Sequence, residues 1–234
     1  MTHYMAELIL TDRPVLMVGG GKVARRKLAG LLASGARVRI VAPELDPWVA
    51  ERVQAGMIQA GQAGGAGQGV GRHVPLVHVA DFFQPHHLAG EEPPVLVFAA
   101  TSDANLNREI ARLCQARGLL CNSADDPAVS GFLVAAMVRR GPVVVGVGSG
   151  GLSPALARLL KERLDRWLEA GWGQVATLFG SKRDLVKGVL PDGEGRQRFW
   201  RETTTALERE GRWDRNDNEP WFLARLEETR KKTN

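Results

Sequence analysis

The sequence is poor in cysteine and contains no long hydrophobic run. Its 234 residues include two cysteines, Cys114 and Cys121, which are too few for a secreted disulfide scaffold or a zinc site with four cysteine ligands. No stretch reaches the roughly 18 apolar residues that a membrane-spanning helix needs, and the first ten residues lack a signal-peptide cleavage pattern. These absences predict a soluble, cytoplasmic protein without a membrane partner.

The charge balance is basic, and metal-binding motifs are missing. Thirty-one lysines and arginines against 26 acidic residues give a net charge of +5, which favours anionic partners such as nucleic acid, phosphate or a polycarboxylate metabolite. The charges are scattered and no RNA-binding aromatic motif or zinc finger accompanies them, so a nucleic-acid partner is not favoured. The five histidines form no HExxH motif, and no metal site is expected.

Strands and helices alternate through the first half of the chain. An apolar run at 13–18 leads into a glycine turn, a helical pattern at 23–33 that Gly35 ends, and a second apolar run at 38–41. This order is typical of the βαβ unit of a parallel sheet. Further candidates are a helix at 47–59, strands at 74–79, 95–100 and 119–121, and a helix at 105–117. The fold class predicted is α/β, with a Rossmann-type parallel sheet.

The pattern changes after residue 122. Residues 131–138 and 142–147 are β-rich, with 139–141 as the expected connecting turn of an antiparallel pair. Ser153-Pro154 opens an amphipathic helix through Leu168, because proline suits the first helical position. From residue 173 onward the pattern is helical and charged. Composition shifts near 115–122 and near 150 indicate boundaries, and the glycine-rich residues 61–71 read as a surface loop.

The glycine turn carries the first functional signal. Gly19-x-Gly21-x-x-Ala24 follows a strand and opens a helix. In this pattern the first glycine allows the tight turn, the second lets the backbone approach a pyrophosphate, and the third position packs the helix on the strand. The pattern predicts dinucleotide binding; the alternative is a tight turn without a ligand.

A ribose-binding acid is expected about 20 residues after such a turn. The nearest acid is Glu44, just after Pro43, and it is either a ribose ligand or a solvated loop charge. Arg39 is close, but no arginine stands at the strand tip to favour a 2′-phosphate, so NAD is preferred over NADP.

Polar residues follow the later strands and the β-rich segment. Thr101 is expected near the nicotinamide half of the cofactor, whereas Asp103 is expected to cap the next helix. Asp125 and Asp126 fit either a general base or metal contact, or an ordinary Asp-Pro turn. Residues 148–154, GSGGLSP, fit an anion-binding nest or a flexible hinge.

These segments together resemble one family. VGGGKVARRK, GARVRIVAP, VFAATSDANLN, NSADDP and GSGGLSPALAR follow one another as in the precorrin-2 dehydrogenase/sirohydrochlorin ferrochelatase family, which includes the N-terminal module of sirohaem synthase. The resemblance covers about residues 5–170. Two departures stand out, the stretch 61–71, which looks like an insertion, and the segment 132–137, which lacks a proline that many relatives carry. Neither departure removes a motif residue.

The resemblance implies an architecture and an activity. It implies an NAD-binding Rossmann domain at 1–117, a dimerisation and active-site region at 118–150, and a helical C-terminal domain at 151–234. The implied assembly is a homodimer held largely by the β-rich segment. The implied reaction is NAD-dependent oxidation of precorrin-2, a tetrapyrrole, to sirohydrochlorin. The alternatives are a bifunctional enzyme that also inserts ferrous iron, and a non-catalytic NAD-sensing Rossmann module.

The resemblance also assigns residue roles. Asp125 matches the family's catalytic aspartate and is the candidate general base. The cofactor contacts implied by the turn motif and the resemblance are Gly19, Gly21, Lys22, Val23, Ala24, Pro43, Glu44 and Thr101. The substrate contacts expected are Asn122, Ser149, Gly150, Gly151 and Ser153.

Overall fold

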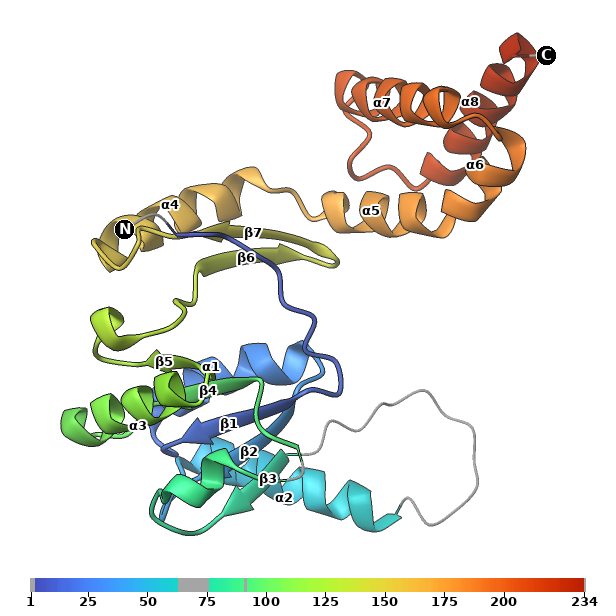
Figure 1. The fold of residues 1–234 in the computed structure, drawn as a ribbon. Helices are drawn as coiled ribbons and strands as arrows, with labels where there is room; N and C mark the ends of the chain where they lie inside the picture. The colour runs from blue at the N-terminus through green and yellow to red at the C-terminus, as the bar shows by residue number, and fades with distance from the viewer. Residues whose placement is uncertain (1–2, 63–75, 91, 234) are drawn as a thin grey trace. The chain divides into compact units, whose positions relative to one another are not determined.

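The computed structural model describes residues 3–62, 76–90 and 92–233. The chain divides into two compact units, residues 1–134 and 135–234, and each is described by itself (Figure 1). This division differs from the three expected segments. The strand at Leu120–Ser123 pairs with Leu96–Ala99 in the sheet of the first unit, so a boundary at 117 would cut that sheet.

The first unit is built on a five-stranded parallel sheet with the strand order β3-β2-β1-β4-β5. The strands are β1 (Pro14–Val18), β2 (Arg37–Val41), β3 (Leu76–Val79), β4 (Leu96–Ala99) and β5 (Leu120–Ser123). The chain moves outward from β1 in one direction and then returns to build β4 and β5 on the other side. The strand order therefore reverses between β1 and β4, and the carboxyl edge at such a point is where open α/β sheets bind ligands.

Helices cover both faces of this sheet, as strands buried on both sides require. The helices are α1 (Lys22–Ala33), α2 (Pro47–Gln62) and α3 (Ala104–Ala116), with short 3-10 turns η1 (Pro85–Leu88) and η2 (Pro127–Val129). Val15 and Met17 of β1 pack into a core with α1 and α2, whereas Leu16 and Val18 pack into a second core with α3. This alternation follows from the two-residue period of a strand.

The expected loop at 61–71 is only partly described. α2 extends through Gln62, so its last two residues overlap the start of that stretch, and the remainder lies outside the described residues.

The second unit begins with an antiparallel hairpin, β6 (Ala136–Arg140) and β7 (Val143–Val147). The strand pair was expected, but the turn lies at Gly141-Pro142 and not at 139–141, and the first strand begins at 136 and not at 131. Gly141 has φ +54°, and a two-residue hairpin turn of the II′ type needs glycine at this first central position. Arg140 therefore stays in the ladder.

Helices make up the rest of this unit (Figure 1). They are α4 (Pro154–Trp167), α5 (Gly171–Ser181), α6 (Arg183–Val189), α7 (Gly193–Arg209) and α8 (Asn218–Thr233). α4 packs on the hairpin. A separate core joins α6, α7 and α8 through Val186, Phe199 and Phe222. The helical character expected after residue 150 is confirmed.

Two glycines of α5 give a matched test of this packing. A Cβ at Gly173 would lie within 3.0 Å of Arg140 backbone atoms, whereas one at Gly180 would meet nothing within 4 Å. We expect Gly173→Ala to destabilise the protein by about 1–3 kcal/mol through overpacking. Gly180→Ala should stabilise it by up to about 1 kcal/mol through helix propensity. Urea unfolding of both variants measures the difference, and equal effects would contradict the close approach.

Candidate active site

The glycine turn joins the ends of three neighbouring strands. The Gly19 backbone N–H donates to Val41 O at 2.9 Å, which ties the turn to the end of β2. Gly19 has φ +104°, and a Cβ there would lie within 3.0 Å of the Ala100 carbonyl group just after β4. Only glycine accepts both this backbone conformation and this contact. The tight-turn role expected of Gly19 thus has a direct packing cause.

The N-terminus of α1 presents free backbone donors. Gly21 is its N-cap residue, no side chain caps it, and its first turn contains no acidic residue. A Cβ at Gly21 would meet nothing within 4 Å, so the place that a side chain at this position would take is open among the residues the structure describes. Unpaired N–H groups and the helix dipole at such a terminus attract phosphate. This geometry fits the diphosphate of a dinucleotide.

The other expected cofactor residues surround this turn. Ala24 is fully buried against the sheet, as expected for the third position of the pattern. Lys22 is the first residue of α1 and is exposed, and Val23 packs partly against the core. A Cβ at Gly20 would lie within 3.0 Å of the Glu44 carbonyl oxygen, so the Pro43-Glu44 segment lies against the turn.

Basic side chains flank the same turn. Lys22, Arg25 and Arg26 line a surface hollow with Trp48, and the Arg25 guanidinium lies 3.7 Å from Asp46. Their positive charge suits a polyanionic ligand. Arg39 lies within β2, the strand that leads to Glu44, and donates instead to His87 O at 2.7 Å.

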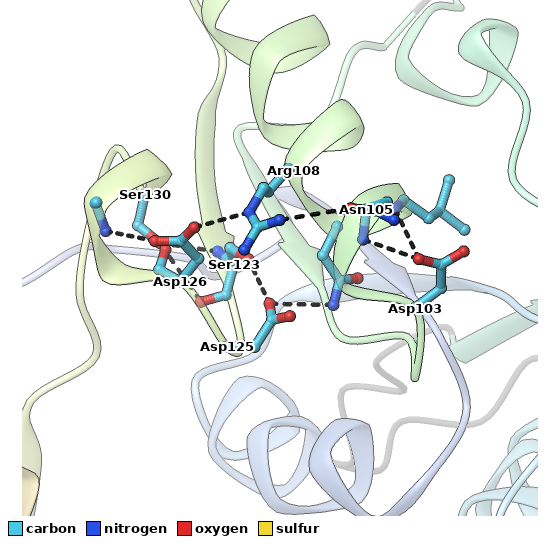
Figure 2. Close-up of polar contacts among 10 residues, drawn as sticks. Asp103, Asn105, Arg108, Ser123, Asp125, Asp126 and Ser130 are labelled. Atoms are coloured by element: carbon cyan, nitrogen blue, oxygen red, sulfur yellow. Dashed lines mark hydrogen bonds and ion pairs between the residues drawn. The ribbon is translucent and has the colours of Figure 1, made fainter.

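A hydrogen-bonded network connects the ends of β4 and β5. Asn107 of α3 accepts from the Thr101 backbone N–H and from Thr101 Oγ1 through its Oδ1, at 3.1 and 2.8 Å. Its Nδ2 donates to Thr101 O and to Asp125 Oδ1, both at 3.2 Å. Ser123 Oγ also donates to Asp125 Oδ1, at 2.8 Å (Figure 2). No hydrogen bond reaches Asp125 Oδ2 among the described residues. Thr101 and Asp125, which were expected to share the site, are thus linked.

Asp126, the carboxylate next to Asp125, has a structural role. Asp126 Oδ2 accepts from Arg108 Nε at 3.1 Å, and Oδ1 accepts from the Ala128 N–H at 3.1 Å, which caps η2 (Figure 2). The hydrogen bond from Arg108 is the main reason why the pKa of Asp126 lies below its usual range. Asp103 caps α3 by accepting from the Asn105 and Leu106 N–H groups, as expected.

Asn122, which was expected to contact the substrate, is held by hydrogen bonds inside the first unit. Its side chain is buried, its Oδ1 accepts from Lys27 Nζ at 2.7 Å, and its Nδ2 donates to Phe132 O at 3.0 Å. Burial is the main cause that lowers the pKa of Lys27, and Arg26 adds to it. Asn122 therefore ties α1 and residue 132 to β5, and its contact with a substrate stays a prediction.

The remaining expected substrate residues lie in the second unit, between β7 and α4. Gly150 and Gly151 have φ +62° and +81°. Ser149 Oγ accepts from the Ser153 N–H at 3.1 Å, and Ser153 Oγ accepts from the Leu156 N–H at 3.3 Å. Ser153 is therefore the N-cap of α4, and Ser149 closes the turn before it. Their contact with a substrate stays a prediction.

Sequence reasoning missed Asn107, Gly20, Ser123 and Arg108. Asn107 could have been found, because it stands at helical spacing before Ile110, Ala111 and Cys114 on the buried face of α3. A polar residue at the start of an apolar stripe needs a hydrogen-bonded partner. Cys114 and Cys121 are buried in the core beside this face, and both are free thiols.

The described residues contain no group of three or more His, Cys, Asp or Glu side chains placed to hold a metal ion. Within the same residues, no helix has the length and apolar character needed to cross a membrane.

Comparisons with known proteins agree with this geometry. An NAD(P)-binding family matches residues 7–136. The chain belongs to this family. A second family model, the sirohaem synthase dimerisation region, matches residues 171–219. The first match covers the sheet, the glycine turn and the Asp125 network, so a nicotinamide dinucleotide is the cofactor class of this unit.

The chain is also similar to sirohaem synthases. It is 38% identical to that of Methylobacillus flagellatus over 191 residues, covering 82% of this chain and 36% of the relative. It is 40% identical to sirohaem synthase 2 of Aeromonas hydrophila over 194 residues, again covering 82% and 36%. The chain thus spans about a third of the length of these relatives. The family resemblance drawn from the motifs is confirmed.

One solved structure shares the whole fold. The precorrin-2 dehydrogenase SirC matches with a TM-score of 0.70 at 22% identity, covering 97% of this chain and 100% of that one. This likeness confirms the expected architecture, a Rossmann-type sheet followed by a helical region.

Gly21 offers a test of the cofactor site. Gly21→Asp should lower NAD affinity at least about 100-fold, because a carboxylate would occupy the anion position at the helix N-terminus. Stability should not fall, because aspartate is a favourable N-cap and the position is open. Titration calorimetry and thermal unfolding measure the two effects, with Gly21→Asn as the uncharged control. Unchanged NAD binding in Gly21→Asp would refute this role of the turn.

Proposed function

We propose that this protein catalyses the NAD-dependent oxidation of precorrin-2 to sirohydrochlorin. One continuous set of contacts carries the proposal. The glycine turn lies against Ala100, Thr101 follows it, and Asn107 joins Thr101 to Asp125. The proposed dinucleotide site would thus share one edge of the sheet with a carboxylate whose Oδ2 has no hydrogen-bond partner among the described residues. The names of the relatives, sirohaem synthase and precorrin-2 dehydrogenase, supply the substrate class.

The residues of the glycine turn would hold the cofactor. The α1 N–H groups would bind its diphosphate, and Gly21 leaves the room it needs. Glu44 would accept from the ribose hydroxyls and would repel a 2′-phosphate, while Arg39 is occupied by His87 O. These features favour NAD over NADP. When bound, the cofactor supplies the hydride acceptor for the oxidation.

Asp125 would act as the general base. Oxidation of precorrin-2 removes a hydride and a proton from the macrocycle. Asp125 Oδ1 is anchored by Asn107 and Ser123, which leaves Oδ2 to take the proton.

Precorrin-2 is a polycarboxylate, so the net charge of +5 and the Ser149–Gly151 turn favour its binding. Cofactor contacts from Lys22, Val23 and Pro43 remain part of this proposal.

The active assembly would be a homodimer. The dimerisation region matched at 171–219 supports a second copy as the partner. Apolar side chains near and on α4 support it too, because Leu152 is 92% exposed and Leu156, Leu159 and Trp167 are also exposed. We propose that the hairpin β6–β7 contributes to the same contact.

An anaerobic absorption spectrum tests the activity. Purified protein is mixed with enzymatically made precorrin-2, with and without NAD, and ferrous iron is added afterwards. The sirohydrochlorin spectrum should form only with NAD and protein together. A further protein-dependent change with iron would show the bifunctional enzyme. Bound NAD without any spectral change would overturn the proposal in favour of a sensor module.

The two adjacent aspartates provide a matched pair of variants. Asp125→Asn should lower kcat about 10²- to 10⁴-fold, the usual contribution of a general base, while the Kd for NAD stays within about threefold. Asp126→Asn should keep most of the activity, because an asparagine can still cap η2. Steady-state kinetics and NAD titration compare the two variants. Equal activity in both would rule out Asp125 as the base.

A further inference from the structure

We propose that Asn107 is the positioning residue of this site, holding Asp125 in a fixed relation to Thr101 on the cofactor side. The inference rests on the proposed function, since it concerns the same carboxylate. Asn107 stands on the buried face of α3 and is 1% exposed. Water therefore cannot replace its hydrogen bonds.

The orientation of the Asn107 amide is determined by the backbone. The Thr101 N–H can only donate and the Thr101 carbonyl can only accept, so Oδ1 must face the first and Nδ2 the second. The second N–H of Nδ2 then points to Asp125 Oδ1. All four hydrogen-bonding positions of the amide are used. The contact with Asp125 is consequently a hydrogen bond that Asn107 donates.

The hydrogen bonds that Asp125 accepts do not come from the charged groups around it. Arg108, from α3, is bonded to Asp126. Asp103, at the start of α3, accepts from backbone N–H groups of that helix. The donors to Asp125 are therefore two neutral side chains, Asn107 and Ser123. Both donate to Asp125 Oδ1, and this defines the position of Asp125 Oδ2.

A structural role alone would not need this arrangement. Three hydrogen bonds to Thr101 already join α3 to the end of β4. The fourth hydrogen bond of the Asn107 amide reaches the end of a different strand, β5. Its acceptor there is Asp125, the carboxylate that is not bound to Arg108. Because a displacement of about 1 Å can lower a rate about 10²-fold, this hydrogen bond matters for catalysis more than for folding.

Asn107→Asp separates the two roles. The new side chain keeps an acceptor for the Thr101 N–H and hydroxyl but loses both amide N–H groups, so it no longer donates to Thr101 O and places a second carboxylate against Asp125, which it repels. We expect kcat to fall about 10- to 100-fold at pH 8, with the Kd for NAD within about threefold of wild type. The ratio of variant to wild-type kcat should rise toward pH 5.5. The pair of carboxyls then shares a proton, and a protonated Asp at 107 can again donate.

Two further variants control this experiment. Asn105→Asp makes the same change two residues earlier on an exposed part of α3 and should leave kcat within about twofold at every pH. Asn107→Ala should lose a similar factor in kcat without recovery at low pH, because alanine cannot donate. It also decides the question if the Asp variant does not fold.

The outcomes distinguish the two proposals. Wild-type protein that does not oxidise precorrin-2 overturns the proposed function and this inference with it. An active wild type with Asn107→Asp and Asn107→Ala kcat values unchanged overturns the inference alone. A parallel loss of NAD affinity, thermal stability and kcat, without a pH-dependent ratio, would also overturn it, since that result describes a purely structural residue.

Discussion

The glycine turn after β1 is packed directly against neighbouring backbone, and this contact determines how the carboxyl edge of the sheet is built. A Cβ at Gly19 would overlap the Ala100 carbonyl group, and one at Gly20 would overlap the Glu44 carbonyl oxygen. Because both side chains are absent, the ends of β1, β2 and β4 come together at the point where the strand order reverses. α1 then begins with uncapped N–H groups. The packing that closes the turn thus also sets the position of the helix N-terminus proposed to bind the diphosphate.

The polar network extends this edge toward β5 without adding a charged partner to the candidate base. A buried amide such as Asn107 is costly unless its hydrogen bonds are satisfied, and here they are. The network therefore has one favoured arrangement. Asp126 is bonded to Arg108 and caps η2, whereas Asp125 Oδ2 has no hydrogen-bond partner among the residues that the structure describes. Two adjacent residues of the same type thus have different hydrogen-bond partners because different residues of α3 reach them.

In the second unit, too, a small residue allows close packing and a side chain bonds the end of a helix. Gly173 allows α5 to approach the Arg140 backbone, and the Arg140 side chain donates to Leu168 O at 3.0 Å at the end of α4. The hairpin is thereby tied to the helix that packs on it. Leucines near and along α4 are exposed, and they lie outside residues 171–219, which the family comparison matches to a dimerisation region.

The sequence by itself determined the elements, because their causes are local. Apolar runs specify the strands, Asp103 and Ser153 cap their helices, and the glycine pattern predicts the turn. One local expectation was wrong. The turn expected at 139–141 lies at 141–142, because Gly141 takes the positive φ and Arg140 stays paired with Val143. The partner of Asn122 could not be predicted from local sequence, because Lys27 reaches it across 95 residues.

Only the tertiary structure decided which hydrogen bonds each of the two aspartates makes. The sequence left Asp125 and Asp126 equivalent, with the family resemblance as the sole reason to prefer the first. The residues that distinguish them, Asn107 and Arg108, lie 18 positions earlier and are adjacent on α3. Which of them reaches which carboxylate depends on how α3 packs against β4 and β5. That packing follows from the burial of a whole helix face, and no local pattern around residue 125 encodes it.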